Sequence, residues 1–369
     1  MSDRIVLIVA RILSYVEDTG AANFLAPLSG ALQGLGHDVI MTAAESGARQ
    51  LAELGVGFHR PDGDLLTQYR PDAVVVGTAK NPDTLGLTLI DRARTRSITS
   101  FGAVDGANAM ELRFAGRSND PLAHRPDYLL VPDAAIAAGY VALGMPEARV
   151  VVCGHPHVDR ASRRREELAM EGRPAVRRRV LPDAGGRRVM VFLGEASHGL
   201  DAGRFERQPG YSLHGRGGSD LRTHIVIEEF LDASAALDPR PYRVLRLHPR
   251  DDLEEYRPYL AEFDTVSRGG DPLELMYAAD LVVGLTTILM VESTVLGTPT
   301  LAVLPRMLER HWITAIAAGV IPCATDRAGL IAALREPPIP NEKSDRFLLR
   351  DSAVHMAAAI SERIESKAI

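Results

Sequence analysis

Residues Leu281–Pro305 have the sequence LVVGLTTILMVESTVLGTPTLAVLP, which predicts the architecture of the chain more clearly than any other stretch. The first five residues are apolar and include two valines, as expected of a buried parallel strand. Thr286 and Thr287 are suited to cap the start of a helix, and Gly297 marks its end. Thr300–Leu304 is a second apolar run, so the stretch predicts a strand–helix–strand unit of an α/β protein.

The start of this predicted helix is suited to bind an anion. The hydroxyl side chains of Thr286 and Thr287 and the free N–H groups of the first turn lie at the positive end of the helix dipole. Further along the helix, Glu292 offers a carboxylate that can accept hydrogen bonds from ribose hydroxyls. A nucleoside diphosphate suits this combination best, although most capped helices of α/β proteins bind nothing.

Composition indicates a globular chain of two domains. The 369 residues exceed one ordinary core, and 46% hydrophobic with 24% charged residues is typical of folded proteins. The net charge of −6 argues against a broad basic surface for nucleic acid. No run of 18 apolar residues occurs, and Arg11 interrupts the first apolar segment, which lacks a cleavage site. We therefore expect no membrane insertion, no signal peptide and a cytoplasmic location.

Short apolar runs alternate with amphipathic segments along the whole chain, which is the pattern of parallel sheets covered by helices. The predicted strands are Ile12–Val16, Asp38–Thr42, Ala73–Gly77, Ile98–Val104, Tyr128–Pro132, Val150–Gly154, Val189–Gly194, Tyr242–Leu247, Thr265–Ser267, Leu281–Leu285, Thr300–Leu304 and Ile321–Ala324. The predicted helices are Ala22–Leu35, Glu45–Leu54, Pro82–Arg94, Asp133–Leu143, Asp220–Leu237, Leu253–Leu260, Pro272–Ala279, Ile288–Leu296, Arg306–Ala318 and Arg327–Leu334.

A polar, arginine-rich segment at residues 160–188 separates two halves of this pattern. We predict a first Rossmann-like domain at residues 1–172, a linker at 173–188 and a second Rossmann-like domain at 189–342. A last helix within residues 343–369 follows the proline-rich EPPIPNEK and is expected to cross back onto the first domain. The arginines of the separating segment are expected to lie mainly on a solvated face.

Four motifs resemble those of enzymes with the GT-B fold. GAANFLAPLSGALQGLGHDVIMTA (Gly20–Ala43) resembles their opening loop, first helix and GH-x-V strand, and VVVCGHPHVD (Val150–Asp159) resembles the TGNP-x-x-D stretch that ends their first domain. RLHPRDD (Arg246–Asp252) is similar to the HP strand end of glycerophosphotransferases. The most specific match is the stretch Tyr277–Val303, YAADLVVGLTTILMVESTVLGTPTLAV. It resembles an element of GT-B enzymes in which a strand is followed by paired serines, a glutamate and Gly-x-Pro.

The resemblance implies an α/β chain of two Rossmann-like domains whose parallel sheets face each other across a cleft. It also implies that the C-terminal domain holds a nucleotide-sugar donor, UDP-linked by expectation, and that the N-terminal domain holds a hydroxyl-bearing acceptor. We expect a metal-independent glycosyltransferase that needs no cofactor besides the donor and has no nucleic-acid partner. A homodimer is compatible with these expectations.

Three alternatives to a glycosyltransferase remain. They are a CDP-polyol phosphotransferase, a nucleotide-sugar 2-epimerase and a nucleotide-sugar-binding module without activity. The GTRPE signature that opens the non-hydrolysing UDP-N-acetylglucosamine 2-epimerases is absent from this chain, which counts against that activity.

Carboxylates that follow predicted strands are candidates for a general base. Glu17 and Asp18 lie in the loop EDTGAAN, whose small residues let a substrate approach the backbone. Asp105 precedes Gly106 at the end of another strand, the edge at which open α/β sheets bind ligands. A positioned carboxylate can take the proton of an acceptor hydroxyl as it attacks. The simpler interpretation is that Asp18 caps a helix and Asp105 forms a turn.

Histidine, arginine and small polar residues are the expected contacts for substrate and donor. His248 and Arg250 end the strand VLRLHPR and are suited to neutralise a leaving diphosphate. The loop HGRGGSD carries His214 and Arg216 and has the composition of a weak phosphate-binding loop. The full predicted set is Gly20, Asn23, His155, His214, Arg216, His248, Arg250, Thr286, Thr287 and Glu292, with no metal ligands.

Overall fold

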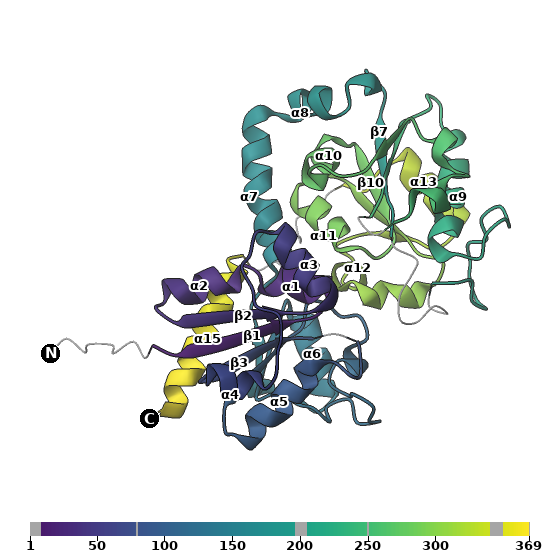
Figure 1. Cartoon of the computed structure of the whole chain (residues 1–369). Coiled ribbons are helices and arrows are strands. Elements are labelled where there is room, and N and C mark those ends of the chain that lie inside the picture. Colours follow the sequence, from purple (N-terminus) through teal and green to yellow (C-terminus); the bar gives the residue numbers. More distant parts are fainter. Residues whose placement is uncertain (1–8, 79, 196–204, 249–250, 340–349, 369) are drawn as a thin grey trace. The chain divides into compact units, whose positions relative to one another are not determined.

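The computed structural model describes residues 9–78, 80–195, 205–248, 251–339 and 350–368, which belong to two α/β units (Figure 1). Unit 1 comprises Met1–Asp159 and Leu348–Ile369, and unit 2 comprises Arg160–Phe347. The division after Asp159 differs from the predicted linker at 173–188, because Arg173–Val180 form helix α8. This helix packs against α10 (Pro272–Ala278) within unit 2.

Unit 1 is built on a six-stranded sheet with the order β2-β1-β3-β4-β5-β6, in which every neighbouring pair is parallel. Its strands are β1 (Arg11–Val16), β2 (Asp38–Ala43), β3 (Ala73–Gly77), β4 (Thr99–Ala103), β5 (Tyr128–Val131) and β6 (Val150–Val152). Its helices are α1 (Thr19–Leu25), α2 (Leu28–Gly34), α3 (Glu45–Glu53), α4 (Leu65–Tyr69), α5 (Leu85–Thr95), α6 (Ala134–Ala142) and α15 (Ser352–Ala368), with 3₁₀ turns η1 (Met110–Leu112) and η2 (Glu147–Arg149). The predicted strands agree with the observed ones to within two residues at each end.

The predicted helix Ala22–Leu35 is two helices, α1 and α2, in the structure. Pro27 lies between them, and it has no N–H group with which to continue the hydrogen-bond ladder of α1. Helix α1 also begins earlier than predicted, because Asp18 caps it and Thr19 is its first residue.

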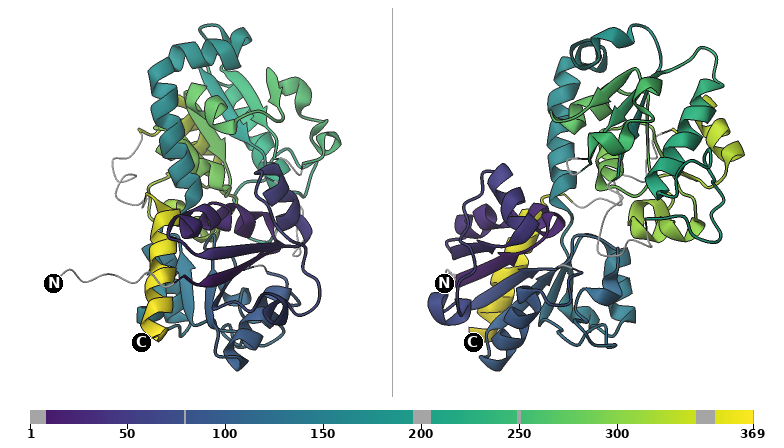
Figure 2. Two further views of the ribbon diagram at one scale, coloured as in Figure 1. Left: turned by 60° about the vertical axis from the view of Figure 1, so that its left-hand side comes forward. Right: turned by 45° about the vertical axis from the view of Figure 1, so that its right-hand side comes forward.

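Helix α15 belongs to unit 1 although it follows unit 2 in the sequence, which confirms the predicted return of the last helix. It packs beside α2, as Figure 2 shows, and its apolar side chains lie in the core of unit 1. The buried residues are Met356, Ala357, Ile360 and Ile364. At its start, the backbone N–H of Ser352 donates to a carboxylate oxygen of Asp159 at 2.9 Å.

Unit 2 contains a second six-stranded parallel sheet, with the order β12-β11-β10-β7-β8-β9. The strands are β7 (Val189–Leu193), β8 (Tyr242–Arg246), β9 (Thr265–Ser267), β10 (Leu281–Gly284), β11 (Thr300–Val303) and β12 (Cys323–Ala324). Besides α8 and α10, the helices are α7 (Pro156–Glu171, in unit 2 from Arg160), α9 (Arg222–Ala235), α11 (Ile288–Val295), α12 (Thr314–Ala317) and α13 (Arg327–Arg335). The 3₁₀ turns are η3 (Pro182–Ala184), η5 (Leu253–Tyr256), η6 (Leu260–Glu262) and η7 (Met307–Trp312).

Two predicted helices of unit 2 are shorter than expected. The segment Leu253–Leu260 forms only the 3₁₀ turn η5, which ends before Pro258. The segment Arg306–Ala318 divides into η7 and α12, because Ile313 has an extended backbone between them. None of the helices in the described ranges has the length and apolar character needed to cross a bilayer.

The arginines of α7 and α8 have a structural role beyond a solvated face. Arg165 donates to the carbonyl of Val295 at 3.1 Å, Arg173 to that of Ala279 at 2.7 Å, and Arg177 to that of Ala278 at 2.8 Å. These carbonyls lie at the C-terminal ends of α10 and α11, where cations satisfy unpaired acceptors and oppose the helix dipole. The basic segment therefore binds the helices that cover the sheet of unit 2.

Candidate functional site

Two carboxylates of unit 1, Asp18 and Asp105, meet beside Gly20. Asp18 follows β1 and Asp105 follows β4, so both lie at the carboxyl edge of the sheet. A Cβ atom built on Gly20 would lie 2.0 Å from Oδ2 of Asp105 and 3.4 Å from Oδ1 of Asp18. Gly77, at the end of β3 between them, lets α1 cross closely, since a Cβ there would lie 2.7 Å from the Cβ of Ala21.

The side chain of Arg113 holds one face of this carboxylate pair. Its Nη1 donates to Oδ1 of Asp105 at 2.7 Å and to the hydroxyl of Thr78 at 3.1 Å. Its Nε donates to the carbonyl of Asn108 at 3.1 Å, and the side chain is 6% exposed. Arg113 was not predicted from the sequence, because no local pattern indicates that an arginine after η1 contacts the carboxylate that follows β4.

The surroundings push the pKa values of the two carboxyl groups in opposite directions. Burial and the neighbouring charge of Asp105 raise the pKa of Asp18 to about 6. Burial is the largest single influence on Asp105 and acts to raise its pKa, but the charge and hydrogen bond of Arg113, together with a backbone hydrogen bond, leave this pKa below its usual value. Two neighbouring acids whose pKa values diverge are typical of acid–base sites.

His155, a predicted binding residue, lies in the same cluster, and its imidazole is neutral. Its Nδ1 accepts the backbone N–H of His157 at 3.1 Å, and its ring packs edge-on against Phe24 at 5.2 Å between centroids. Burial lowers the pKa of His155 to about 3, and the ring is also hydrogen-bonded to the backbone of Asp105. His155 therefore supports the loop of Asp105 as a neutral group.

Glu17 points away from the pair and binds three neighbouring side chains. It accepts the hydroxyl of Tyr15 at 2.9 Å, the amide of Asn81 at 2.8 Å and the hydroxyl of Thr84. These contacts tie β1 to the segment before α5. Of the three carboxylates predicted for catalysis, the structure thus joins Asp18 and Asp105, with Gly20. Asn23 is half-buried within α1.

Gly20→Ala is expected to destabilise unit 1 by about 1–3 kcal/mol, the usual cost of overpacking, because its new Cβ would collide with Asp105. The matched control is Gly30→Ala in α2, where a Cβ meets nothing within 4 Å. That change should stabilise the chain by about 0.5–1 kcal/mol, since alanine favours a helix. Urea unfolding of both variants measures the difference. Equal stability of the two would show that Asp105 does not press against Gly20.

In unit 2, a carboxylate of the chain itself occupies part of the predicted anion site. Glu195 follows β7, and its Oε2 accepts the backbone N–H of Thr286 at 2.7 Å. Its Oε1 accepts the hydroxyl of Thr286, also at 2.7 Å. Thr287 caps α11 as predicted, accepting the N–H of Leu289 at 3.4 Å. An anion bound at Thr286 would therefore meet the charge of Glu195.

A fully buried arginine, Arg222 at the start of α9, completes this cluster. It donates to Oε1 of Glu195 at 3.0 Å, to the hydroxyl of Thr286 at 3.3 Å and to Oε2 of Glu309 at 2.8 Å. Its guanidinium carbon lies 4.9 Å from the ring centre of Trp312. Arg222 and Glu309 were not predicted from the sequence, because they lie on separate elements and meet only in the folded unit.

The other predicted donor contacts are placed less favourably. Glu292 is fully buried in α11 and presents no surface to a ligand in this structure. His248 is half-buried at the end of β8, and its backbone N–H donates to Asp251 at 2.7 Å. Arg250 lies outside the described residues.

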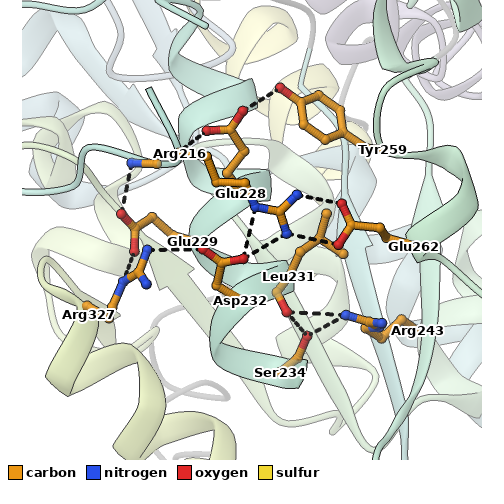
Figure 3. Close-up of polar contacts among 11 residues, drawn as sticks. Arg216, Glu228, Glu229, Leu231, Asp232, Ser234, Arg243, Tyr259, Glu262 and Arg327 are labelled. Atoms are coloured by element: carbon orange, nitrogen blue, oxygen red, sulfur yellow. Dashed lines mark hydrogen bonds and ion pairs between the residues drawn. The ribbon is translucent and has the colours of Figure 1, made fainter. Parts of the chain in front are cut away.

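The glycine-rich loop of unit 2 is bound to carboxylates of α9 rather than left open for phosphate (Figure 3). The N–H of Gly215 donates to Glu229 at 2.9 Å, and that of Arg216 donates to Glu228 at 2.5 Å. The guanidinium of Arg216 pairs with Asp232 at 2.7 Å and with Glu262 at 2.8 Å. The backbone of His214 is held by Glu229 as well, while its side chain is exposed. This differs from the predicted phosphate-binding loop, because acidic residues of the chain take its donors.

Metal binding was not expected from the sequence. In the parts of the chain that the structure describes, no group of three or more His, Cys, Asp or Glu side chains is arranged to hold a metal ion.

Nearly the whole chain is similar in fold to solved enzymes, among them UDP-GlcNAc 2-epimerases. The UDP-GlcNAc 2-epimerase of Neisseria meningitidis, bound to UDP-GlcNAc, matches with a TM-score of 0.62 at 15% identity, over 97% of this chain and 100% of that one. The wall teichoic acid polymerase TagF matches with a TM-score of 0.53 at 15% sequence identity, over 97% of this chain and 89% of that one. A glycosyltransferase of Rickettsia africae matches with a TM-score of 0.53 at 10% sequence identity, over 97% of this chain and 94% of that one.

At these identities the likeness shows the fold, which is of the GT-B type, as predicted. No protein-family model matches the sequence, and no curated protein is recognisably similar to it.

Proposed function

We propose that this chain is an enzyme that acts on nucleotide sugars and transfers a sugar from a nucleotide-activated donor to a hydroxyl group, without a metal ion. The observation that carries this proposal is the Asp18–Asp105 pair beside Gly20 at the carboxyl edge of a GT-B-type unit. A carboxylate with a pKa near 6 is ionised at neutral pH and is basic enough to take a proton as a bond forms.

In this proposal Asp18 is the general base and the donor is bound by unit 2. The acceptor oxygen forms a bond to the anomeric carbon while its proton passes to Asp18. The bond from that carbon to the diphosphate oxygen breaks, and its electron pair leaves with the nucleoside diphosphate. The start of α11 supplies partial positive charge for the donor's phosphates at Thr287, because Glu195 already accepts the N–H and the hydroxyl of Thr286.

A second candidate reaction is inversion of a C–H centre in the sugar of the donor. Inversion requires one group that removes a proton and another that returns it to the opposite face. Asp18, whose pKa is raised to about 6, is suited to one of these two proton transfers. The similarity in fold to UDP-GlcNAc 2-epimerases favours this candidate over the remaining ones.

One experiment separates these reactions. Donors linked to UDP, GDP, dTDP and CDP are first ranked by the rise in melting temperature that each causes. The best donor is then incubated in D₂O, in excess EDTA, with a mixture of hydroxyl acceptors, and the products are followed by mass spectrometry and NMR.

Sugar transfer is expected to release nucleoside diphosphate in step with a glycosylated acceptor, and EDTA should not prevent it. Deuterium entering the sugar of an intact donor would indicate epimerisation instead. Release of CMP from a CDP-polyol would indicate phosphotransfer. Tight donor binding with no product from any acceptor would indicate a binding module and would overturn the enzymatic proposal.

A further inference from the structure

The guanidinium of Arg113 is fixed by three acceptors from two segments of unit 1. Asp105 after β4, Thr78 after β3 and the carbonyl of Asn108 each accept one of its hydrogen bonds, at 2.7, 3.1 and 3.1 Å. A planar guanidinium bound at several points has little freedom to turn. The charge of Arg113 therefore has a defined position on one side of the carboxylate pair.

The two oxygens of Asp105 have different surroundings as a result. Oδ1 binds Arg113, while Oδ2 faces Gly20 on the side where Asp18 lies. Asp18 is held differently, since its Oδ1 accepts the N–H of Ala21 at the start of α1 at 2.7 Å. One carboxylate of the pair thus has a buried cation as its partner, and the other has a helix cap.

We propose that Arg113 is a positioning residue that gives the two carboxylates separate roles. It fixes Asp105 as a permanent anion and leaves Asp18 as the group that gains and loses the proton. The inference rests on the proposed function only in treating this pair as the site of proton transfer. Which carboxylate holds the proton is measurable without a substrate, so the two proposals can fail separately.

The charges around the pair support this division. Asp105, Arg113 and Glu17 act on Asp18, and the main charge that acts on Asp105 is that of Arg113, since His155 is neutral. Without Arg113, the half-buried Asp105 would lose its cation, and its ionised form would become less favourable. Asp18 would keep its helix cap and would then ionise first. Removal of Arg113 should therefore reverse the order in which the two groups titrate.

The test is a ¹³C NMR titration of the aspartate side-chain carboxyl groups in the full chain without ligand, with signals assigned from Asp18→Asn and Asp105→Asn. In the wild type, Asp105 should ionise at a lower pH than Asp18. In Arg113→Gln, Asp18 should ionise first and the midpoint of Asp105 should rise by at least about one pH unit. The matched control is Arg117→Gln, because Arg117 pairs with Asp83 in the same unit and is 77% exposed.

Arg117→Gln should leave both midpoints unchanged. Arg113→Lys keeps the positive charge but not the planar guanidinium, and in this variant Asp105 should still ionise before Asp18. This variant provides the test if Arg113→Gln does not fold. In Asp105→Asn the midpoint of Asp18 should fall, because its neighbouring negative charge is gone. An unchanged order in folded Arg113→Gln, or an unchanged Asp18 midpoint in Asp105→Asn, would overturn the proposal.

Discussion

Asp18→Asn is expected to lower turnover at least about a hundredfold, because a positioned general base typically contributes about 10²–10⁴-fold to such a step. The amide has nearly the shape of the carboxylate but cannot take the proton. Asparagine caps a helix about as well as aspartate, so α1 should keep its start and the melting temperature should stay close to that of the wild type. Steady-state kinetics with the best donor and thermal unfolding measure the two effects.

The matched control for this variant is Asp326→Asn, since Asp326 caps α13 by accepting the N–H of Gly329 at 2.7 Å. Its turnover should be that of the wild type. Wild-type turnover should also rise as the pH passes about 6, because Asp18 acts as a base only when ionised. Near-normal turnover in Asp18→Asn would assign the role to Asp105, to Glu17 or to a substrate group, and would leave Asp18 as a helix cap.

Arg222→Met should lower the free energy of unfolding by about 3–5 kcal/mol, the usual effect of removing one partner from a buried ion pair. Arg222 and Glu309 are both fully buried, and the change would take from Glu309 one of its two cations, the other being Arg306 at 2.7 Å, and would take from Glu195 its arginine partner. Methionine has a similar volume, so the loss would come from charge rather than from a cavity. Urea unfolding monitored by circular dichroism gives the value.

Arg257→Met is the control for this change, because Arg257 pairs with Glu254 while 77% exposed and should contribute far less. A double variant, Arg222→Met with Glu309→Gln, should recover part of the stability, since it removes the buried negative charge that has lost one of its two cations. If Arg222→Met costs no more than Arg257→Met, the buried cluster does not stabilise unit 2.

Local signals account for the parts of the fold that the sequence predicts well. The unit β10–α11–β11 agrees closely with expectation, because its apolar runs, the cap at Thr287 and the stop at Gly297, where φ is +74°, each depend on neighbouring residues alone. Pro27 divides a helix that the apolar pattern alone suggests is continuous.

The candidate site was predictable only where it depends on strand ends. Asp18 and Asp105 were identified because polar residues that follow parallel strands gather at one edge of a sheet. Arg113 was not predicted although Asp105 is only eight residues away, because no helical or strand period relates the two positions of an irregular loop. Arg222 was not predicted because Glu195 and Glu309 are 27 and 87 residues away in the sequence. The carboxylates Glu228, Glu229 and Asp232, which take the donors of the glycine-rich loop, lie on α9 and become its partners only in the folded unit.

The position of α15 in the sequence determines the order in which the two units are completed during synthesis. Unit 2 lies between the two parts of unit 1 in the sequence, so its residues leave the ribosome before α15 does. Met356, Ile360 and Ile364 fill the interior of unit 1, which remains incomplete on the nascent chain until they arrive. The unit whose synthesis begins first is therefore completed last. Until α15 has been synthesised, part of the apolar core of unit 1 lacks its covering helix, and such exposed apolar surface is what chaperones bind.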